Sequence, residues 1–118
     1  MAVFKHEVVT EIPSDVTSID GYLAWVEGEL GADLYASLSQ YVLDERQVLV
    51  NHMRYIDAET GKLHAIRFFS TPAAATVSKN SLVNMLGDVT DPVITIGDVE
   101  EITEAAMDEL LLLDQNHI

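Results

Sequence analysis

Two β-rich runs joined by a short turn constrain this chain more than any other feature. QVLVNHMRYI (47–56) and KLHAIRFF (62–69) are rich in β-branched and aromatic residues, and DAETG connects them. Gly61 can supply the positive φ that a tight loop needs. The two runs therefore predict a β-hairpin in which Asp57 pairs with Lys62.

That pairing sets the register of the whole hairpin. It places His52 opposite Arg67, Arg54 opposite Ala65, Val50 opposite Phe69 and Ile56 opposite Leu63. Side chains that face one another across a hairpin lie close enough to interact. One face of the hairpin is therefore expected to carry two arginines and a histidine inside an apolar frame.

These three residues, His52, Arg54 and Arg67, are the candidate ligand-binding site. Arginine on an otherwise apolar face binds carboxylate or phosphate bidentately, and histidine transfers protons near neutral pH. A small anionic or enolisable ligand would suit such a site. The structural alternative is that both arginines pair with glutamates of a neighbouring element or a partner subunit, while His52 donates one hydrogen bond. The pattern assigns no catalytic residue.

Length and composition narrow the protein class. A chain of 118 residues is expected to form one domain, 1–118, and a hydrophobic content of 48% excludes a disordered chain. No apolar run approaches the roughly 20 residues that span a bilayer, so no membrane partner is expected. The formal net charge of −14 repels nucleic-acid phosphates. These features indicate a cytoplasmic protein that does not bind nucleic acid.

The sequence also gives no reason to expect a metal or a cofactor. It contains no cysteine, so a cysteine-bound zinc is excluded. His6 and His64 are single histidines on predicted strands, without a second ligand at metal-binding spacing. No glycine-rich phosphate loop is present.

The remaining elements follow from hydrophobic periodicity and from capping signals. We predict a strand at 3–12, a helix from Ile19 to Gly31, a helix from Thr71 to Gly87, a strand at 93–96 and a helix after Asp98. The segment 34–43 is ambiguous. Leu34, Ala36, Leu38 and Val42 would line one face of a strand, and Leu34, Leu38, Tyr41 and Val42 one face of a helix. We favour the strand.

The order of these elements predicts an α+β fold of the ferredoxin-like βαββαβ type. Helices would cover one face of an antiparallel sheet, with an extra C-terminal helix and, at 34–43, one extra strand. The hairpin strands carry apolar residues on both faces, including Val48 and Ile56 on one and Met53 and Tyr55 on the other. A sheet with one solvated face is polar on that side. We therefore expect a second copy to cover the open face, which makes the protein a homodimer.

Two segments, GADLYASLSQYVLDERQVLVNHMRYI and FFSTPAAA, resemble parts of the dimeric α+β barrel superfamily. The first is similar to the strand–turn–strand of small antibiotic-biosynthesis-monooxygenase-type domains, and the second to a strand-to-helix step common in the superfamily. The order of elements is similar over residues 3–99. The resemblance implies ferredoxin-like protomers that dimerise around a cavity, and it carries no activity.

The C-terminal part of the chain suggests a different class of function. Four consecutive leucines at 110–113 exceed what one helix stripe needs, and acidic residues crowd the same segment. The alternative to a ligand-binding protein is therefore a non-enzymatic acidic interaction protein, either an assembly module or a nucleic-acid mimic.

Overall fold

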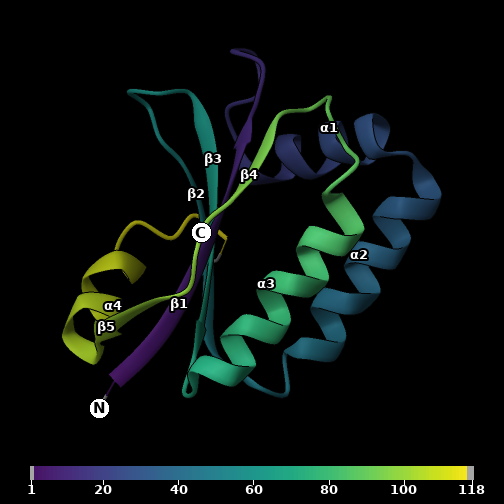
Figure 1. Cartoon of the computed structure of the whole chain (residues 1–118). Helices are drawn as coiled ribbons and strands as arrows, with labels where there is room; N and C mark the ends of the chain where they lie inside the picture. The colour runs from purple at the N-terminus through teal and green to yellow at the C-terminus, as the bar shows by residue number, and fades with distance from the viewer. Residues whose placement is uncertain (1, 117–118) are drawn as a thin grey trace.

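The computed structural model describes residues 2–116, which place three helices on one side of an antiparallel sheet and a fourth on the other (Figure 1). The elements are β1 (Ala2–Glu11), α1 (Ile19–Leu30), α2 (Ala32–Glu45), β2 (Leu49–Ile56), β3 (Lys62–Phe69), α3 (Pro72–Leu86), β4 (Ile94–Ile96), β5 (Glu100–Thr103) and α4 (Glu104–Leu111). The strand order is β2-β3-β1-β4, and β5 also pairs with β1.

The α+β class that the sequence predicts is confirmed. The strict βαββαβ order is not reproduced, because two helices instead of one separate β1 from β2, and because β5 and α4 follow β4. Capping side chains start the first and third helices, as the capping signals of the sequence indicate: Ser18 Oγ accepts from the Gly21 N–H at 3.0 Å and Thr71 Oγ1 from the Ala74 N–H at 3.2 Å.

The strand favoured at 34–43 is wrong, because this segment lies within helix α2. Gly31 ends α1 with a φ of 87°, a conformation that favours glycine, and the chain then starts a second helix. With a helical period, Leu38 and Val42 lie on one face together with Tyr35 and point towards the sheet. Leu38 and Val42 thus face the sheet from a second helix rather than from a further strand.

The predicted start of the last helix, after Asp98, is also wrong. Residues 100–103 form β5, which pairs with the beginning of β1, Lys5 with Glu100 and Ala2 with Thr103. The helix begins only at Glu104, where Thr103 Oγ1 accepts from the Ala106 N–H at 3.1 Å. Residues 100–103 have a helical period, but their pairing with β1 overrides it. The local sequence pattern does not reveal this pairing.

The hairpin register is confirmed over most of its length. His52 lies opposite Arg67, Arg54 opposite Ala65 and Ile56 opposite Leu63, and Gly61 has the expected positive φ, 68°. The predicted pair of Val50 with Phe69 is wrong, since the register shifts between Leu49 and Asn51 and Leu49 pairs with Phe69. One extra residue in a strand is the mark of a β-bulge.

Strand β2 is at the edge of the sheet. Its backbone groups that point away from β3 form hydrogen bonds with side chains and with one backbone N–H. The Arg54 N–H donates to Asp114 Oδ1 and the Ile56 N–H to Gln115 Oε1, while the Gln115 N–H donates to the Arg54 carbonyl at 2.7 Å. The His52 N–H donates to the side chain of Asn51. Bonds of this kind block the pairing of an edge with another strand.

The second face of the sheet is covered in part by α4. Met107 of α4 packs in one buried cluster with Val3, Met53, Ile66 and Phe68, and Tyr55 and Leu110 lie against it (Figure 1). The two apolar faces of the hairpin are therefore explained within one chain, so they give no independent reason for a second copy. None of the helices in residues 2–116 is long and apolar enough to cross a membrane.

Candidate functional site

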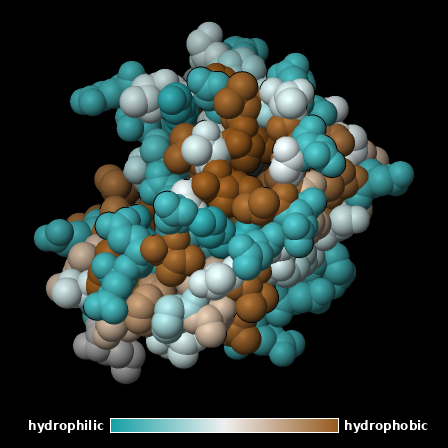
Figure 2. Space-filling model, viewed as in Figure 1, coloured by the Kyte–Doolittle hydropathy of each residue, from teal (hydrophilic) through white to brown (hydrophobic). Residues whose placement is uncertain are grey.

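A cavity of about 300 Å³ lies between the sheet and the three helices that cover it. Figure 2 shows hydrophobic residues gathered, around a hollow, over the region where α1 and α3 meet the sheet. The volume is at the lower end of the range for small-molecule sites. The lining residues come from seven elements: Val8 and Thr10 (β1); Tyr22, Leu23, Val26 and Leu30 (α1); Tyr35, Leu38, Ser39, Val42, Leu43 and Arg46 (α2 and its end); Arg54 (β2); Ala65 and Arg67 (β3); Leu82 and Leu86 (α3); and Ile94 (β4).

The charges in this lining are all positive. Arg46, Arg54 and Arg67 are three of the six Lys and Arg residues of the chain, and among residues 2–116 no Asp, Glu or His lines the cavity. In a protein with 20 acidic residues, such a lining concentrates positive charge inside an otherwise negative molecule. A cavity with charge of one sign and apolar walls attracts ligands of the opposite sign.

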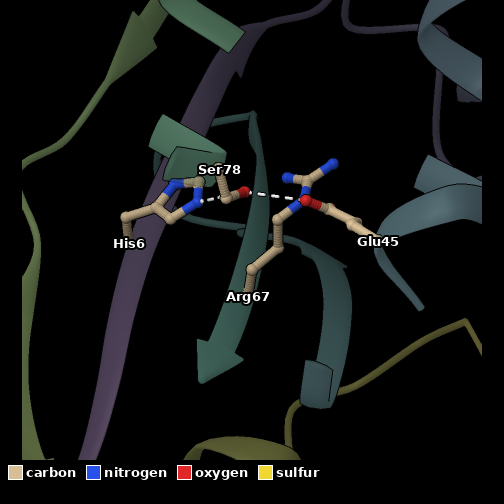
Figure 3. Close-up of polar contacts among 4 residues, drawn as sticks. All are labelled: His6, Glu45, Arg67 and Ser78. Atoms are coloured by element: carbon tan, nitrogen blue, oxygen red, sulfur yellow. Dashed lines mark hydrogen bonds and ion pairs between the residues drawn. The ribbon is translucent and has the colours of Figure 1, made fainter. Parts of the chain in front are cut away.

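Arg67 has a buried partner. Its Nε–H donates to Glu45 Oε1 at 2.5 Å, and both side chains are buried (Figure 3). Ser78 Oγ–H donates to the second carboxylate oxygen, Glu45 Oε2, at 2.8 Å. Arg67 stands on β3, Glu45 ends α2 and Ser78 lies in α3, so this group of contacts joins the sheet to two helices.

His6 completes the network, and the proton positions follow from its partners. A hydroxyl has one proton, which Ser78 gives to Glu45, so Ser78 Oγ accepts from His6 Nε2–H at 2.9 Å. His6 Nδ1 has no partner within residues 2–116. Burial lowers the pKa of His6 from 6.5 to about 4, and the positive charge of Arg67 is a second, smaller cause of this shift. The imidazole is therefore neutral at pH 7, and its hydrogen bond to Ser78 joins β1 to α3.

Arg54 differs from Arg67 because it has no ion pair. No carboxylate of the described residues lies within 4.0 Å of its guanidinium, although the side chain is half-buried. Burial lowers the pKa of Arg54, and the neighbouring Arg67 contributes in the same direction. A guanidinium nevertheless stays protonated at neutral pH. Arg54 thus holds an uncompensated positive charge against an apolar cavity, which is costly unless a ligand supplies the counter-charge.

Two tyrosines of the helical layer stand near Arg54. Tyr22 of α1 and Tyr35 of α2 line the cavity, and both interact electrostatically with the guanidinium. Burial raises the pKa of Tyr22. The phenol therefore keeps its proton at neutral pH and can donate a hydrogen bond into the cavity. In the sequence, Tyr22 has the spacing of an apolar helix stripe with Ile19 and Val26, and spacing alone does not show which way its hydroxyl points.

The three residues singled out from the sequence are only partly together. Arg54 and Arg67 both line the cavity, but His52 does not. His52 lies opposite Arg67 at the sheet edge, beside a recess of about 20 Å³ that is too small for an organic ligand. The alternative that both arginines pair with glutamates therefore holds for Arg67, which pairs with Glu45. It does not hold for Arg54, which has no such glutamate within residues 2–116.

The opposite face of the sheet carries a second polar cluster. His64 Nδ1 and Glu7 Oε1 are 2.6 Å apart, and the Tyr55 ring stacks on the imidazole with centroids 4.8 Å apart. Burial raises the pKa of Tyr55, and the charges of Glu7 and Asp57 add to this. This cluster borders neither cavity described above. In the part of the chain that the structure describes, no group of three or more His, Cys, Asp or Glu residues could hold a metal.

We predict opposite stability effects for the two cavity arginines. Arg67→Met leaves Glu45 buried without its counter-charge and is expected to lower the free energy of unfolding by about 3–5 kcal/mol. Arg54→Met removes an unpaired charge and is expected to cost less than about 1 kcal/mol or to stabilise the protein. Urea denaturation of both variants checks this. Equal losses would contradict the division into one paired and one unpaired arginine.

A second prediction concerns His6 and pH. The folded protein holds a neutral imidazole with a pKa of about 4, whereas the unfolded chain titrates at 6.5. Between these values the unfolded state binds more protons, so stability is present above pH 6.5 and is lost as the pH falls towards 4. The wild type should lose about 3 kcal/mol more than His6→Gln between pH 7 and pH 4, measured by urea denaturation. An identical pH dependence would show that His6 is not held neutral.

No family model, curated protein or solved structure matches this chain. Its function must therefore be inferred from the chemistry of the cavity: one uncompensated guanidinium, a second guanidinium balanced by Glu45, and two tyrosines set in an apolar wall.

Proposed function

We propose that this protein binds a small organic anion in the cavity between the sheet and helices α1, α2 and α3. The observation that carries the proposal is Arg54. Its guanidinium faces an apolar cavity without an ion pair from the described residues. An anionic ligand would supply the missing counter-charge and would bury its apolar part against the same walls.

Arg67 supports the anion site without adding net charge. Its Nε–H bonds Glu45, which balances its charge, while its terminal NH₂ groups make no hydrogen bond within residues 2–116. In residues 2–116, the side-chain polar atoms that are fully buried without a partner belong to other residues. The NH₂ groups of Arg67 are therefore accessible. Arg67 therefore offers donors that are already held in place by the Glu45 contact.

The proposal is one of binding and includes no catalytic step. Acid–base chemistry is carried most often by histidine or a carboxylate within hydrogen-bond reach of the substrate. The described part of the chain places neither in the cavity lining, and His6 and Ser78 lie outside it with their hydrogen bonds directed at each other and at Glu45. The cavity is thus better suited to holding a ligand than to transferring its protons.

The test combines a screen with a variant that fills the cavity. A thermal-shift screen of small organic anions, followed by titration of the fluorescence of the single tryptophan, should find ligands; Trp25 lies 6.5 Å from the cavity residue Tyr22. Ala65→Leu adds three carbons at the cavity floor and is expected to weaken binding at least tenfold.

Ala36→Leu is the matched control, because Ala36 is exposed on α2 and does not line the cavity. It should bind the same ligands with wild-type affinity. A screen without ligands, or ligands that bind Ala65→Leu as tightly as the wild type, would contradict the proposed function.

We propose, second, that the chain is a ferredoxin-like protomer, similar to those of the dimeric α+β barrel superfamily, and that it forms a homodimer. The sheet order β2-β3-β1-β4 supports the fold. Exposed apolar residues support the dimer: Leu43, Val48 and Val50 are 51%, 56% and 46% exposed where α2 leads into β2. Because α4 occupies part of the second sheet face, this patch is the surface that we assign to the second copy.

Light scattering at tens of micromolar protein tests the dimer. The double variant Val48→Lys, Val50→Lys should be monomeric, because lysines on both copies would meet in the interface. Val77→Lys places a charge on an apolar residue that is 64% exposed on α3 and should leave the dimer intact. A monomeric wild type would overturn this proposal and would leave the cavity proposal unaffected.

A further inference from the structure

The charges and the size of the cavity point to a more specific class of ligand. The inference rests on the proposed function, since it takes binding in this cavity as given. We infer that the ligand is an apolar monocarboxylate. Its carboxylate meets Arg54 and the terminal NH₂ groups of Arg67, and its hydrocarbon part lies against the side chains of α1, α2 and α3.

The charge of the ligand follows from the balance of charges in the cavity. Glu45 neutralises Arg67, so Arg54 is left as the uncompensated charge of the inner wall, while Arg46 is exposed to solvent. A carboxylate carries one negative charge and matches this balance. A phosphate monoester carries about −1.5 to −2 at pH 7 and would bring excess negative charge into an apolar site.

The arrangement of donors suits two oxygens. Arg54 lies opposite Ala65 in the hairpin, and Arg67 is two residues further along the same face of the neighbouring strand. Side chains related in this diagonal way are about 7–8 Å apart at their bases, within reach of long side chains. Two guanidinium groups that converge from such positions can each donate to a carboxylate oxygen. The Tyr22 hydroxyl stands near Arg54 as a further donor.

The rest of the cavity is apolar and limited in length. Leu23 and Val26 of α1, Leu38 and Val42 of α2, Leu82 of α3 and Ile94 of β4 form its walls. The volume of about 300 Å³ is at the lower end of the range for small-molecule sites, so the cavity has room for a short hydrocarbon chain. Hydrocarbon of this length buries its surface there, and a much longer chain would have to extend into solvent.

Three probes with one chain length test the ligand class. Octanoate, octan-1-ol and octyl phosphate each have a chain of eight carbons and differ in the head group. In calorimetric titrations of the full chain, kept below the critical micelle concentration or the solubility limit of each probe, octanoate should bind at least tenfold more tightly than either other probe. In a series from butanoate to tetradecanoate, the affinity should rise to about the length of octanoate or decanoate and then stop rising.

Variants locate the head group. Arg54→Met should abolish the preference for octanoate over octan-1-ol while octan-1-ol still binds, and Arg54→Lys should restore part of that preference because it keeps the charge but loses the guanidinium fork. Lys5→Met is the control: it removes one positive charge from β1, where Lys5 pairs with Glu100 and does not line the cavity. It should keep the wild-type preference.

The outcomes separate the two levels of inference. If octan-1-ol or octyl phosphate binds as tightly as octanoate, and Ala65→Leu weakens that binding, the cavity binds ligands but the monocarboxylate assignment is overturned. The assignment is also overturned if octanoate fails to bind while other organic anions bind in a manner that Ala65→Leu abolishes. If no probe or screened anion binds in an Ala65→Leu-dependent way, the proposed function itself fails.

Discussion

The buried contact between Glu45 and Arg67 is the interaction on which the rest of this structure depends. Glu45 stands at the end of α2, Arg67 on the central part of the sheet, and Ser78 and His6 extend the contact to α3 and β1. A buried charge pair is favourable only when its geometry is held and its remaining polar atoms are bonded. Here the contacts of Glu45, Ser78 and His6 hold α2 and α3 against the sheet. The cavity lies between these layers, so the network that joins them also helps to define where a ligand can lie.

The two cavity arginines show how one residue type serves stability and binding in adjacent positions. Arg67 is neutralised from within the chain and contributes to holding the layers together. Arg54 has no such partner among residues 2–116 and keeps its charge next to apolar side chains. Natural proteins accept local costs of this kind mainly where function requires them. The difference between these two environments, rather than the positive charge itself, is what marks Arg54 as the ligand contact.

The sequence predicts those features of the fold that neighbouring residues determine, and it misses those that depend on distant segments. The hairpin register from His52 to Ile56, the helix caps and the α+β class follow from alternation, turn residues and capping, and they are confirmed. The β-bulge at Val50 and strand β5 are set by pairing with distant segments, which no local pattern shows. Segment 34–43 fits both periods, and Gly31 at positive φ decides for the helix. For the site, the shared face of Arg54 and Arg67 was predictable from the register. The partner Glu45 was not, because it arrives from α2.

The contacts along the outer edge of β2 have a consequence for the cavity. The N–H and the carbonyl of Arg54 are both bonded by the segment at 114–115, 60 residues away in the chain. The backbone that carries the ligand-binding guanidinium is therefore clamped from outside the sheet, by residues that never line the cavity. This makes the segment at 114–115 a remote support of the binding site. Any modification or fusion that displaces it from β2 acts on the position of Arg54, although it lies on the other side of the strand from the ligand.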